Sequence, residues 1–420
     1  MKLKNSTHTP GDLQDFVSEV FASLVRKDQR ATSSYYLQGL MLEGRRKSMQ
    51  PMAMRLGIDH QRLQQFVSTS PWPIEPVRKT LANRAIDLIQ PDAWVVDDTG
   101  FIKDGSASPG VARQYSSTLG KVGNVQIGVS VHAMTDMASC PLDWRLFLPA
   151  SWDETTADTE QERLLIRQRR IRAQIPADVG HRPKWELACE MIDELGNWGV
   201  SPPVVVADAG YGDNGLFRTA LTTRGLDYVV QVKGLTSVHT GDVVFEVPDY
   251  AGFGRPTKPG YRTKPVQAQE LAQSLSLSQY RPVSWRQGSK GTLTSRFTAV
   301  RVRPANRNLP RNDDGTLPAC WLLVEWPSHA EAPTDYWLST LPEDTPIETL
   351  KAWQAFQTVD QASPYLSDAF VDSRFEFRGK TLRGQPENRP RWNRGVALVD
   401  GQLGEVLGQE YVRLHLPASS

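Results

Sequence analysis

Three aspartates are the residues of this sequence best placed to do chemistry, because each follows a short apolar run. Asp97 and Asp98 come directly after the run at 94–96, and Asp208 comes directly after the run at 204–207. A glycine-containing stretch follows each of the two positions. Burying a carboxylate at the end of an apolar strand costs free energy unless a partner compensates its charge. A bound cation is one such partner.

The chemistry depends on whether the two positions converge. In α/β sheets, ligands gather at the carboxyl ends of the strands. Two converging carboxylates make an oxygen-rich site suited to Mg²⁺ or Mn²⁺. A third carboxylate would allow two metal ions about 4 Å apart, the arrangement used for in-line phosphoryl transfer. The spacing also fits a simpler interpretation, in which each aspartate caps a helix or closes an Asx turn.

An α/β pattern surrounds these aspartates. Strand at 204–207, helix at 215–223 and strand at 227–233 imply a parallel pair of strands within one sheet, because the connection between them is a helix. The segment at 235–340 is rich in strands and in Pro, Gly and Ser breaks. The remaining expected elements are strands at 94–96, 124–134 and 142–148, an arginine-dense helix that includes 167–172, and an amphipathic helix at 184–199.

The N-terminal part, residues 11–90, has apolar residues at helical spacing. Within it, 52–56, a turn at Gly57 and 61–67 resemble a small helix–turn–helix. Arg45, Arg46 and Lys47 directly precede this unit. Two interpretations stay open, a helical bundle with a solvated basic turn and a DNA-contacting module.

Composition restricts the function classes. The chain has 420 residues, 39% apolar and 23% charged, and a net charge of +1, so an argument for nucleic acid must rest on local clusters. No apolar run is long enough to span a membrane, and the N-terminus lacks the apolar stretch of a signal peptide. Three distant cysteines without a CxxC pair suit a reducing cytoplasm and exclude a cysteine zinc site. We therefore expect a cytoplasmic protein with no membrane contact.

Long ordered strings in this sequence resemble a known family. VVDDTGFIKDGSASPGVARQYSSTLGKVGNVQIGVSVHA resembles the first active-site segment of bacterial insertion-sequence transposases of the DDE type, the DDE superfamily endonucleases. VVVADAGYGDNGLFRTALTTRGLDYVVQVK resembles their second segment, and WLLVEWPSHAEAPTDYWLSTLPEDTPIETL resembles the stretch before their third. The resemblance covers about residues 15–350. It implies a ribonuclease-H-like core with a β-rich insertion, and cut-and-paste strand transfer at the terminal inverted repeats of double-stranded DNA.

The same resemblance assigns residues. It places the first catalytic aspartate within VDDTG, where Asp98 is favoured because the family has one acidic residue directly before a threonine, and the second on Asp208. Asp97 points to the opposite face of the strand and becomes a supporting or turn residue. Arg113 and Lys121 match family positions and are candidates for phosphate contact, or else ordinary surface cations. It further implies Mg²⁺ or Mn²⁺ as cofactor and a homodimer in the active complex.

The resemblance ends near residue 350. The family's arginine–isoleucine–glutamate run, whose glutamate completes the metal site, is missing. AFVDSRFEFRG, TLRGQPENRPRWNRG and DGQLGEVLGQEYV instead resemble a fragment of the neprilysin-like zinc metallopeptidases, without their HExxH zinc motif. The simplest account is a fusion at 345–355. The alternative is a divergent transposase end in which one glutamate supplies the third ligand, the candidates being Glu376, Glu387, Glu405 and Glu410.

The predicted organisation is therefore an α/β protein in four parts. They are a helical N-terminal region at 1–90, a ribonuclease-H-like core at 91–234, a β-rich insertion and return to the core at 235–345, and a mostly helical, peptidase-like tail at 346–420. The predicted function is metal-dependent DNA transposition, defective in this copy through loss of the third carboxylate. The alternatives are a catalytically inactive DNA-binding remnant and a metallopeptidase-related protein.

Overall fold

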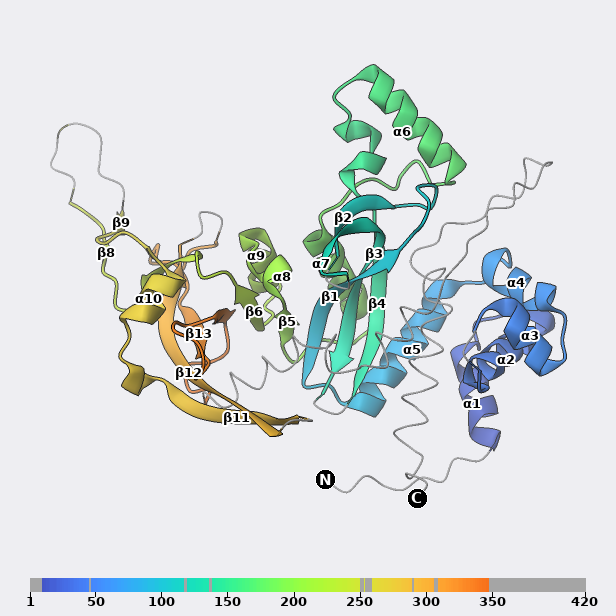
Figure 1. Cartoon of the computed structure of the whole chain (residues 1–420), viewed down its shortest axis with the longest axis horizontal. Coiled ribbons are helices and arrows are strands. Elements are labelled where there is room, and N and C mark those ends of the chain that lie inside the picture. The colour runs from blue at the N-terminus through green and yellow to red at the C-terminus, as the bar shows by residue number, and fades with distance from the viewer. Residues whose placement is uncertain are drawn as a thin grey trace.

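A large mixed sheet with helices beside it forms the centre of the protein (Figure 1). The computed structural model describes residues 10–346, apart from 45–46, 117–118, 136–137, 250–252, 254–258, 289–290 and 306–308. The fold is mixed α/β, as the sequence predicts. None of the helices in this described part has both the length and the apolar run that a membrane crossing requires.

Five helices precede the sheet, and the first four form a group to one side of it (Figure 1). Their small core is closed by Phe66 stacked on Trp72, with ring centroids 5.2 Å apart. Gly57 ends α3 with a φ of 67°, the left-handed conformation that glycine adopts most easily, and so makes the predicted turn before α4. The helices are α1 (Pro10–Val20), α2 (Lys27–Met41), α3 (Met49–Leu56), α4 (His60–Ser68) and α5 (Ile74–Ile89).

The sheet begins with an antiparallel group and continues with a parallel one. β1 (Ala93–Ile102) pairs antiparallel with β3 (Lys121–Met134), which also carries β2 (Ala112–Ser116) and β4 (Ser139–Phe147). On its other side β1 pairs parallel with β5 (Val205–Ala207), and β5 pairs parallel with β6 (Tyr228–Val232). The predicted parallel pair is therefore confirmed.

The strand-rich segment after residue 235 extends the same sheet. β14 (Asp335–Ser339) pairs antiparallel with β6, and β13 (Cys320–Trp326) and β12 (Gly291–Pro304) follow outward. The sheet therefore continues past residue 234 into the segment at 235–345. The smaller elements of this segment are β7 (Ser237–Thr240), β8 (Phe245–Glu246), β9 (Gly260–Tyr261), β10 (Val266–Gln267), α10 (Ala268–Ser274) and β11 (Arg281–Gly288).

Helices cover one face of the central strands. The side chains of β1 alternate, so Trp94 and Val96 pack into a core shared with α5, α7 (Lys184–Asn197) and α9 (Gly215–Thr223). Ala93 and Val95 point into a second core on the opposite face. This alternation decides which of the two adjacent aspartates can face α7.

A buried ion network fixes α5 and α7 to the sheet. Asp143 on β4 is 2% exposed and accepts hydrogen bonds from both Arg78 on α5 and Arg145 on β4. The same two arginines bind Glu194 on α7. The two guanidinium and two carboxylate groups compensate one another, which makes their burial tolerable.

Candidate active site

Two aspartates meet at one edge of the sheet because β1 and β5 are parallel neighbours. In their register Val96 lies opposite Ala207. Asp208 directly follows Ala207, and Asp98 lies two residues beyond Val96. Asp98 lies within β1, just past its pairing with β5, and Asp208 directly follows β5, so both carboxylates lie beyond the same end of the parallel pairing. The expectation that Asp98 ends its strand is wrong, because β1 continues to Ile102. Burial raises the pKa of Asp208, and the charge of Asp98 raises it further.

The strand alternation separates Asp98 from Asp97. Asp98 shares the face of Trp94 and Val96, which is the face that α7 covers. Asp97 lies on the opposite face, and its Oδ1 accepts the backbone N–H of Asp98 at 2.7 Å. This arrangement agrees with the sequence-based choice of Asp98 as the residue that faces Asp208.

Asp208 is held in place by the start of a short helix. It caps α8 (Ala209–Gly212), and its Oδ1 accepts the backbone N–H groups of Gly210 at 2.9 Å and Tyr211 at 3.3 Å. Asp208 is exposed to solvent on one side. The protein atoms around its carboxyl group still displace water, and this desolvation is the largest cause of the rise in its pKa. Asp208 can therefore cap the helix and also form a pair with Asp98. The cap uses only its Oδ1, and the charge of Asp98 acts on the whole carboxyl group.

Lys184 neutralises part of the charge on this pair. Its Nζ donates to Asp98 Oδ2 at 2.7 Å and lies 5.5 Å from the centre of the Phe147 ring. Its charge also opposes, weakly, the rise in the pKa of Asp208 that burial causes. Lys184 is the first residue of α7, where the helix dipole disfavours a cation. The contact with Asp98 is the compensation that makes a lysine favourable at this helix end.

Tyr211 is a buried residue near the carboxylates. It is 3% exposed, and burial raises the pKa of its hydroxyl well above the ordinary value, with further increases from Asp98, Asp97 and Asp208. The Asp98 carboxylate is close enough to the Tyr211 hydroxyl to contribute to the rise in its pKa. Within the described residues, however, the Tyr211 hydroxyl has no hydrogen-bond partner of good geometry. Tyr211 therefore stays protonated and presents a neutral hydroxyl to the acidic group.

The donor set suits one hard divalent ion. Mg²⁺ is commonly bound by one or two protein carboxylates together with water and phosphate oxygens, and Asp98 and Asp208 supply such a pair. Among the described residues, no three His, Cys, Asp or Glu side chains gather closely enough to hold a metal ion. The four glutamates considered as a third ligand, Glu376, Glu387, Glu405 and Glu410, lie outside the described residues.

Comparison with known proteins agrees with this geometry. Residues 19–292 match the DDE superfamily endonuclease family, and this span contains both aspartates and the whole parallel part of the sheet. The chain belongs to this family. A relative, the "Probable transposase for insertion sequence element IS701" of Microchaete diplosiphon, is 28% identical over 203 residues, which are 47% of this chain. The chain covers 48% of that protein, about half its length.

A second family matches the end of the chain. Residues 335–420 match peptidase family M13, in agreement with the resemblance seen in the tail. The match begins before the predicted junction at 345–355 and includes β14. Since β14 pairs with both β6 and β13, this first part of the matching segment is built into the sheet of the DDE endonuclease.

The two phosphate-contact candidates of the endonuclease lie away from the carboxylates. Asp98 pairs with Val129, whereas Lys121 begins β3 eight residues earlier, roughly 26 Å along the strand. Arg113 pairs with Asn124, five residues from Val129 or roughly 16 Å, and lies on the other sheet face. Both are exposed. Any DNA contact they make would be distant from the site of chemistry.

The predicted basic cluster before α3 is described only in part. Arg45 and Arg46 lie outside the described residues, and the ammonium group of Lys47 donates to the carbonyls of Leu40 and Leu42 at the end of α2. This contact favours the structural interpretation for Lys47.

The arginine-dense helix is α6 (Glu160–Arg172). Its Arg169 stacks on Trp152 with its guanidinium 3.6 Å from the ring centre, and Arg170 is 6% exposed and donates to the carbonyls of Trp152, Pro176 and Val179. These two arginines hold the loop structure around α6 and are not available as free surface charges.

Proposed function

We propose that this chain is a DNA transposase of an insertion sequence, of the kind that carries out metal-dependent strand cleavage and transfer at the inverted repeats that end the element. The observation that carries the proposal is that Asp98 and Asp208 lie just beyond the same end of the parallel pairing of β1 with β5 within a DDE endonuclease. The strand order β4-β3-β1-β5-β6, antiparallel up to β1 and parallel beyond it, supports a ribonuclease-H-like core.

Asp98 and Asp208 are the residues that would hold a Mg²⁺ or Mn²⁺ ion. When bound, such an ion supplies activation of the attacking water or 3′-hydroxyl and stabilisation of the leaving oxygen. The protein contributes a fixed orientation, because two backbone N–H groups hold Asp208 and the Asp97 carboxylate holds the Asp98 backbone. Lys184 is placed to release Asp98 to the ion and to turn its ammonium group toward a DNA phosphate.

We further propose that cleavage by this copy is defective. Two carboxylates leave a second metal position without enough ligands, and the segment where the family has its glutamate matches a peptidase family instead. The specific alternative is a catalytically inactive DNA-binding remnant, which keeps end recognition but cannot cleave even when an intact family C-terminus is supplied. A peptidase activity has no support from the sequence, since the tail contains no HExxH.

A paired binding and cleavage assay tests the proposal. The full chain is incubated with duplex DNA that carries the inverted repeats flanking its own gene, with Mg²⁺ or Mn²⁺. We expect a gel shift without strand cleavage. We expect cleavage to appear when residues 350–420 are replaced by the C-terminal segment of an intact family member, and to be lost again when Asp98→Asn or Asp208→Asn is added.

The two results separate the alternatives. Specific binding with no cleavage by the chimera would favour the remnant and contradict the assignment of Asp98 and Asp208. Cleavage by the natural chain, abolished by Glu376→Gln or Glu405→Gln, would show that the tail supplies the third carboxylate. We expect the productive complex to be a homodimer on two element ends, which light scattering of the DNA complex would detect.

A further inference from the structure

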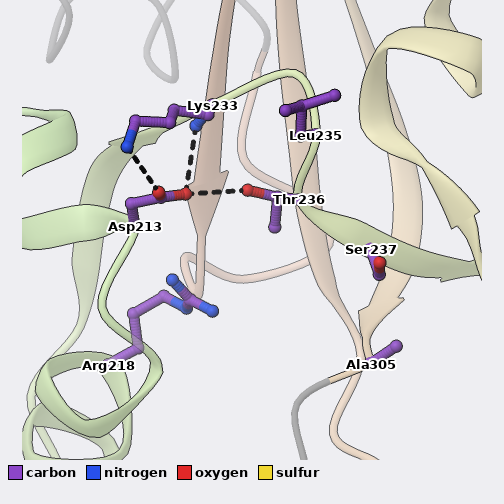
Figure 2. Close-up of a pocket in the computed structure, with 7 residues that line it drawn as sticks. All are labelled: Asp213, Arg218, Lys233, Leu235, Thr236, Ser237 and Ala305. Atoms are coloured by element: carbon purple, nitrogen blue, oxygen red, sulfur yellow. Dashed lines mark hydrogen bonds and ion pairs between the residues drawn. The ribbon is translucent and has the colours of Figure 1, made fainter.

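A polar pocket lies between the turn after α8, the end of β6 and the start of β7 (Figure 2). Arg218, Lys233 and Thr236 line it together with Asp213. Neither the family match nor the aspartate pair assigns it a role. Its charge and position both indicate a ligand.

Arg218 is the unusual member of this pocket. Its side chain is 1% exposed, and Figure 2 shows the guanidinium extending from α9 toward the space between the labelled residues. One guanidinium nitrogen donates to the carbonyl of Gly212, whereas Nε has no hydrogen-bond partner within the described residues. Burial lowers the pKa of this arginine, and the charge of Asp213 acts more weakly in the opposite direction. A buried guanidinium with so few partners is costly unless an anion compensates it.

The nearby carboxylate is already paired with another cation. Asp213 Oδ2 lies 3.2 Å from Lys233 Nζ, and Asp213 Oδ1 accepts from Thr236 Oγ1 at 3.0 Å and from the backbone N–H of Lys233 at 3.3 Å. Figure 2 marks these contacts, and none joins Asp213 to Arg218. Counting Arg218 and Lys233 as positive and Asp213 as negative leaves the pocket with one uncompensated positive charge. A phosphodiester carries the single negative charge that would balance it.

The pocket lies at the same edge of the sheet as the carboxylates. Lys233 directly follows β6, the strand that pairs parallel with β5, and Asp213 is five residues after Asp208 with the single turn of α8 between them. Five residues with a helical rise span roughly 8 Å. Successive phosphates of one DNA strand advance about 3.4 Å along the helix axis. Neighbouring phosphates are farther apart in space than this axial rise, because the backbone winds around the axis. A strand whose reacting phosphate lies at Asp98 and Asp208 would therefore place a neighbouring phosphate at this pocket.

We propose that Arg218 and Lys233 form a binding site for one backbone phosphodiester of the DNA strand whose cleavage takes place at Asp98 and Asp208. This inference rests on the proposed function, since it takes DNA as the ligand. Arg218 is the fixed, buried part of the site. Lys233, with 66% of its side chain exposed, turns from Asp213 to the phosphate.

The first experiment measures the salt dependence of DNA binding. Fluorescence anisotropy follows a labelled 30-base-pair duplex bound by the full chain between 50 and 200 mM NaCl, for the natural chain, Lys233→Gln, Arg218→Gln and the double variant. Loss of one phosphate contact should reduce the slope of log affinity against log salt by about 0.9. Each single variant should show this loss. The double variant should lose no more than about one contact, because both residues bind one phosphate.

A matched control is Arg281→Gln, which removes an exposed cation on β11 that does not line the pocket. It should leave the slope unchanged. If Arg218→Gln fails to fold, the exposed Lys233→Gln and Lys233→Glu still test the site. Lys233 variants that bind with the slope of the natural chain would overturn the proposal and leave the proposed transposase function intact.

The second experiment does not use DNA. Thermal unfolding is measured with dimethyl phosphate, a small phosphodiester, and with uncharged trimethyl phosphate as control. Dimethyl phosphate alone should raise the Tm of the natural chain, and Lys233→Glu should abolish the rise. Stabilisation without any duplex binding would retain an anion site and contradict the transposase function. Equal response of Lys233→Glu and the natural chain would overturn the site.

Discussion

At the scale of single residues, the ion pair between Lys184 and Asp98 shapes the candidate metal site most directly. The ammonium group satisfies one carboxylate of the pair and acts on the other through its charge. A divalent ion entering the same space must therefore compete with Lys184 for Asp98. The sequence alone does not reveal this contact, because Lys184 lies 86 residues from Asp98 and belongs to no motif.

This competition yields a prediction for Lys184→Gln. Removing a positive charge a few ångströms from the ion should tighten Mn²⁺ binding on the order of tenfold, measured by electron paramagnetic resonance or calorimetry. Lys121→Gln is the matched control, since Lys121 is an exposed lysine carried roughly 26 Å away along β3. Weaker Mn²⁺ binding by Lys184→Gln would show that the ammonium group helps to build the site.

A second residue-scale prediction concerns His132 on β3. Burial lowers the pKa of its imidazole from the ordinary 6.5 to about 4, and its ring contacts the hydroxyl of Ser130 at 2.9 Å. Above pH 6.5 the imidazole is neutral in both folded and unfolded chains, so it adds no pH dependence. Between pH 6.5 and 4 only the unfolded chain takes up the proton, and stability falls by as much as about 3 kcal/mol.

The measurement is chemical denaturation at several pH values for the natural chain and His132→Gln, whose side chain does not titrate. The difference in unfolding free energy between the two should be constant above pH 6.5 and should shift in favour of the variant as the pH falls toward 4. Parallel pH profiles would mean that the imidazole is protonated equally in both states.

At the scale of elements, the buried network of Asp143, Glu194, Arg78 and Arg145 joins α5, β4 and α7. Asp143→Ala would leave two arginines close together with one carboxylate fewer. Breaking a buried ion pair by removing one partner costs about 3–5 kcal/mol, so we expect a loss of that size in unfolding free energy.

Glu19→Gln is the control for this prediction. It breaks the ion pair with Arg84, which is also on α5 but is about half exposed on both sides. Exposed pairs contribute about 0–1 kcal/mol, so urea denaturation should detect little change. Equal effects of the two substitutions would show that the network does not anchor α5.

The sequence predicted helices and turns well where a local feature, such as apolar spacing or a glycine, directly produces the element. The helix expected at 215–223 is α9, and the expected turn at Gly57 separates α3 from α4. The parallel pairing of β5 and β6 follows from the helix that connects them. The sequence does not reveal that β12 to β14 extend this sheet, since pairing between strands far apart in the chain depends on tertiary packing.

The candidate site was predictable to the same extent. Asp98 and Asp208 stand out because each follows an apolar run, although β1 continues past Asp98 to Ile102. Because side chains alternate along β1, Asp97 lies on the opposite face from Asp98. Tyr211 and Lys184 were missed. A lysine at the first position of a helix opposes the helix dipole, and that conflict is the one local signal for Lys184.

At the scale of the whole molecule, β14 ends at Ser339 and is the last strand of the sheet within the described part of the chain. Every strand pairing of the sheet among the described residues uses residues before 340. We therefore expect that ending the chain after Leu350 leaves the Tm of the remaining protein nearly unchanged in a thermal scan. Ending it before Asp335 removes β14 from between β6 and β13 and should abolish cooperative unfolding.

Iron-mediated backbone cleavage tests the central claim, that Asp98 and Asp208 together form the metal site of a transposase core. Fe²⁺ replaces Mg²⁺ in the full chain, and ascorbate with peroxide then generates radicals that cut the polypeptide beside the bound ion. We predict cuts near residue 98 and near residue 208 in the same sample, suppressed by excess Mg²⁺ and absent from both Asp98→Asn and Asp208→Asn. Cuts at only one of these segments, or cuts that persist in both variants, would contradict the account.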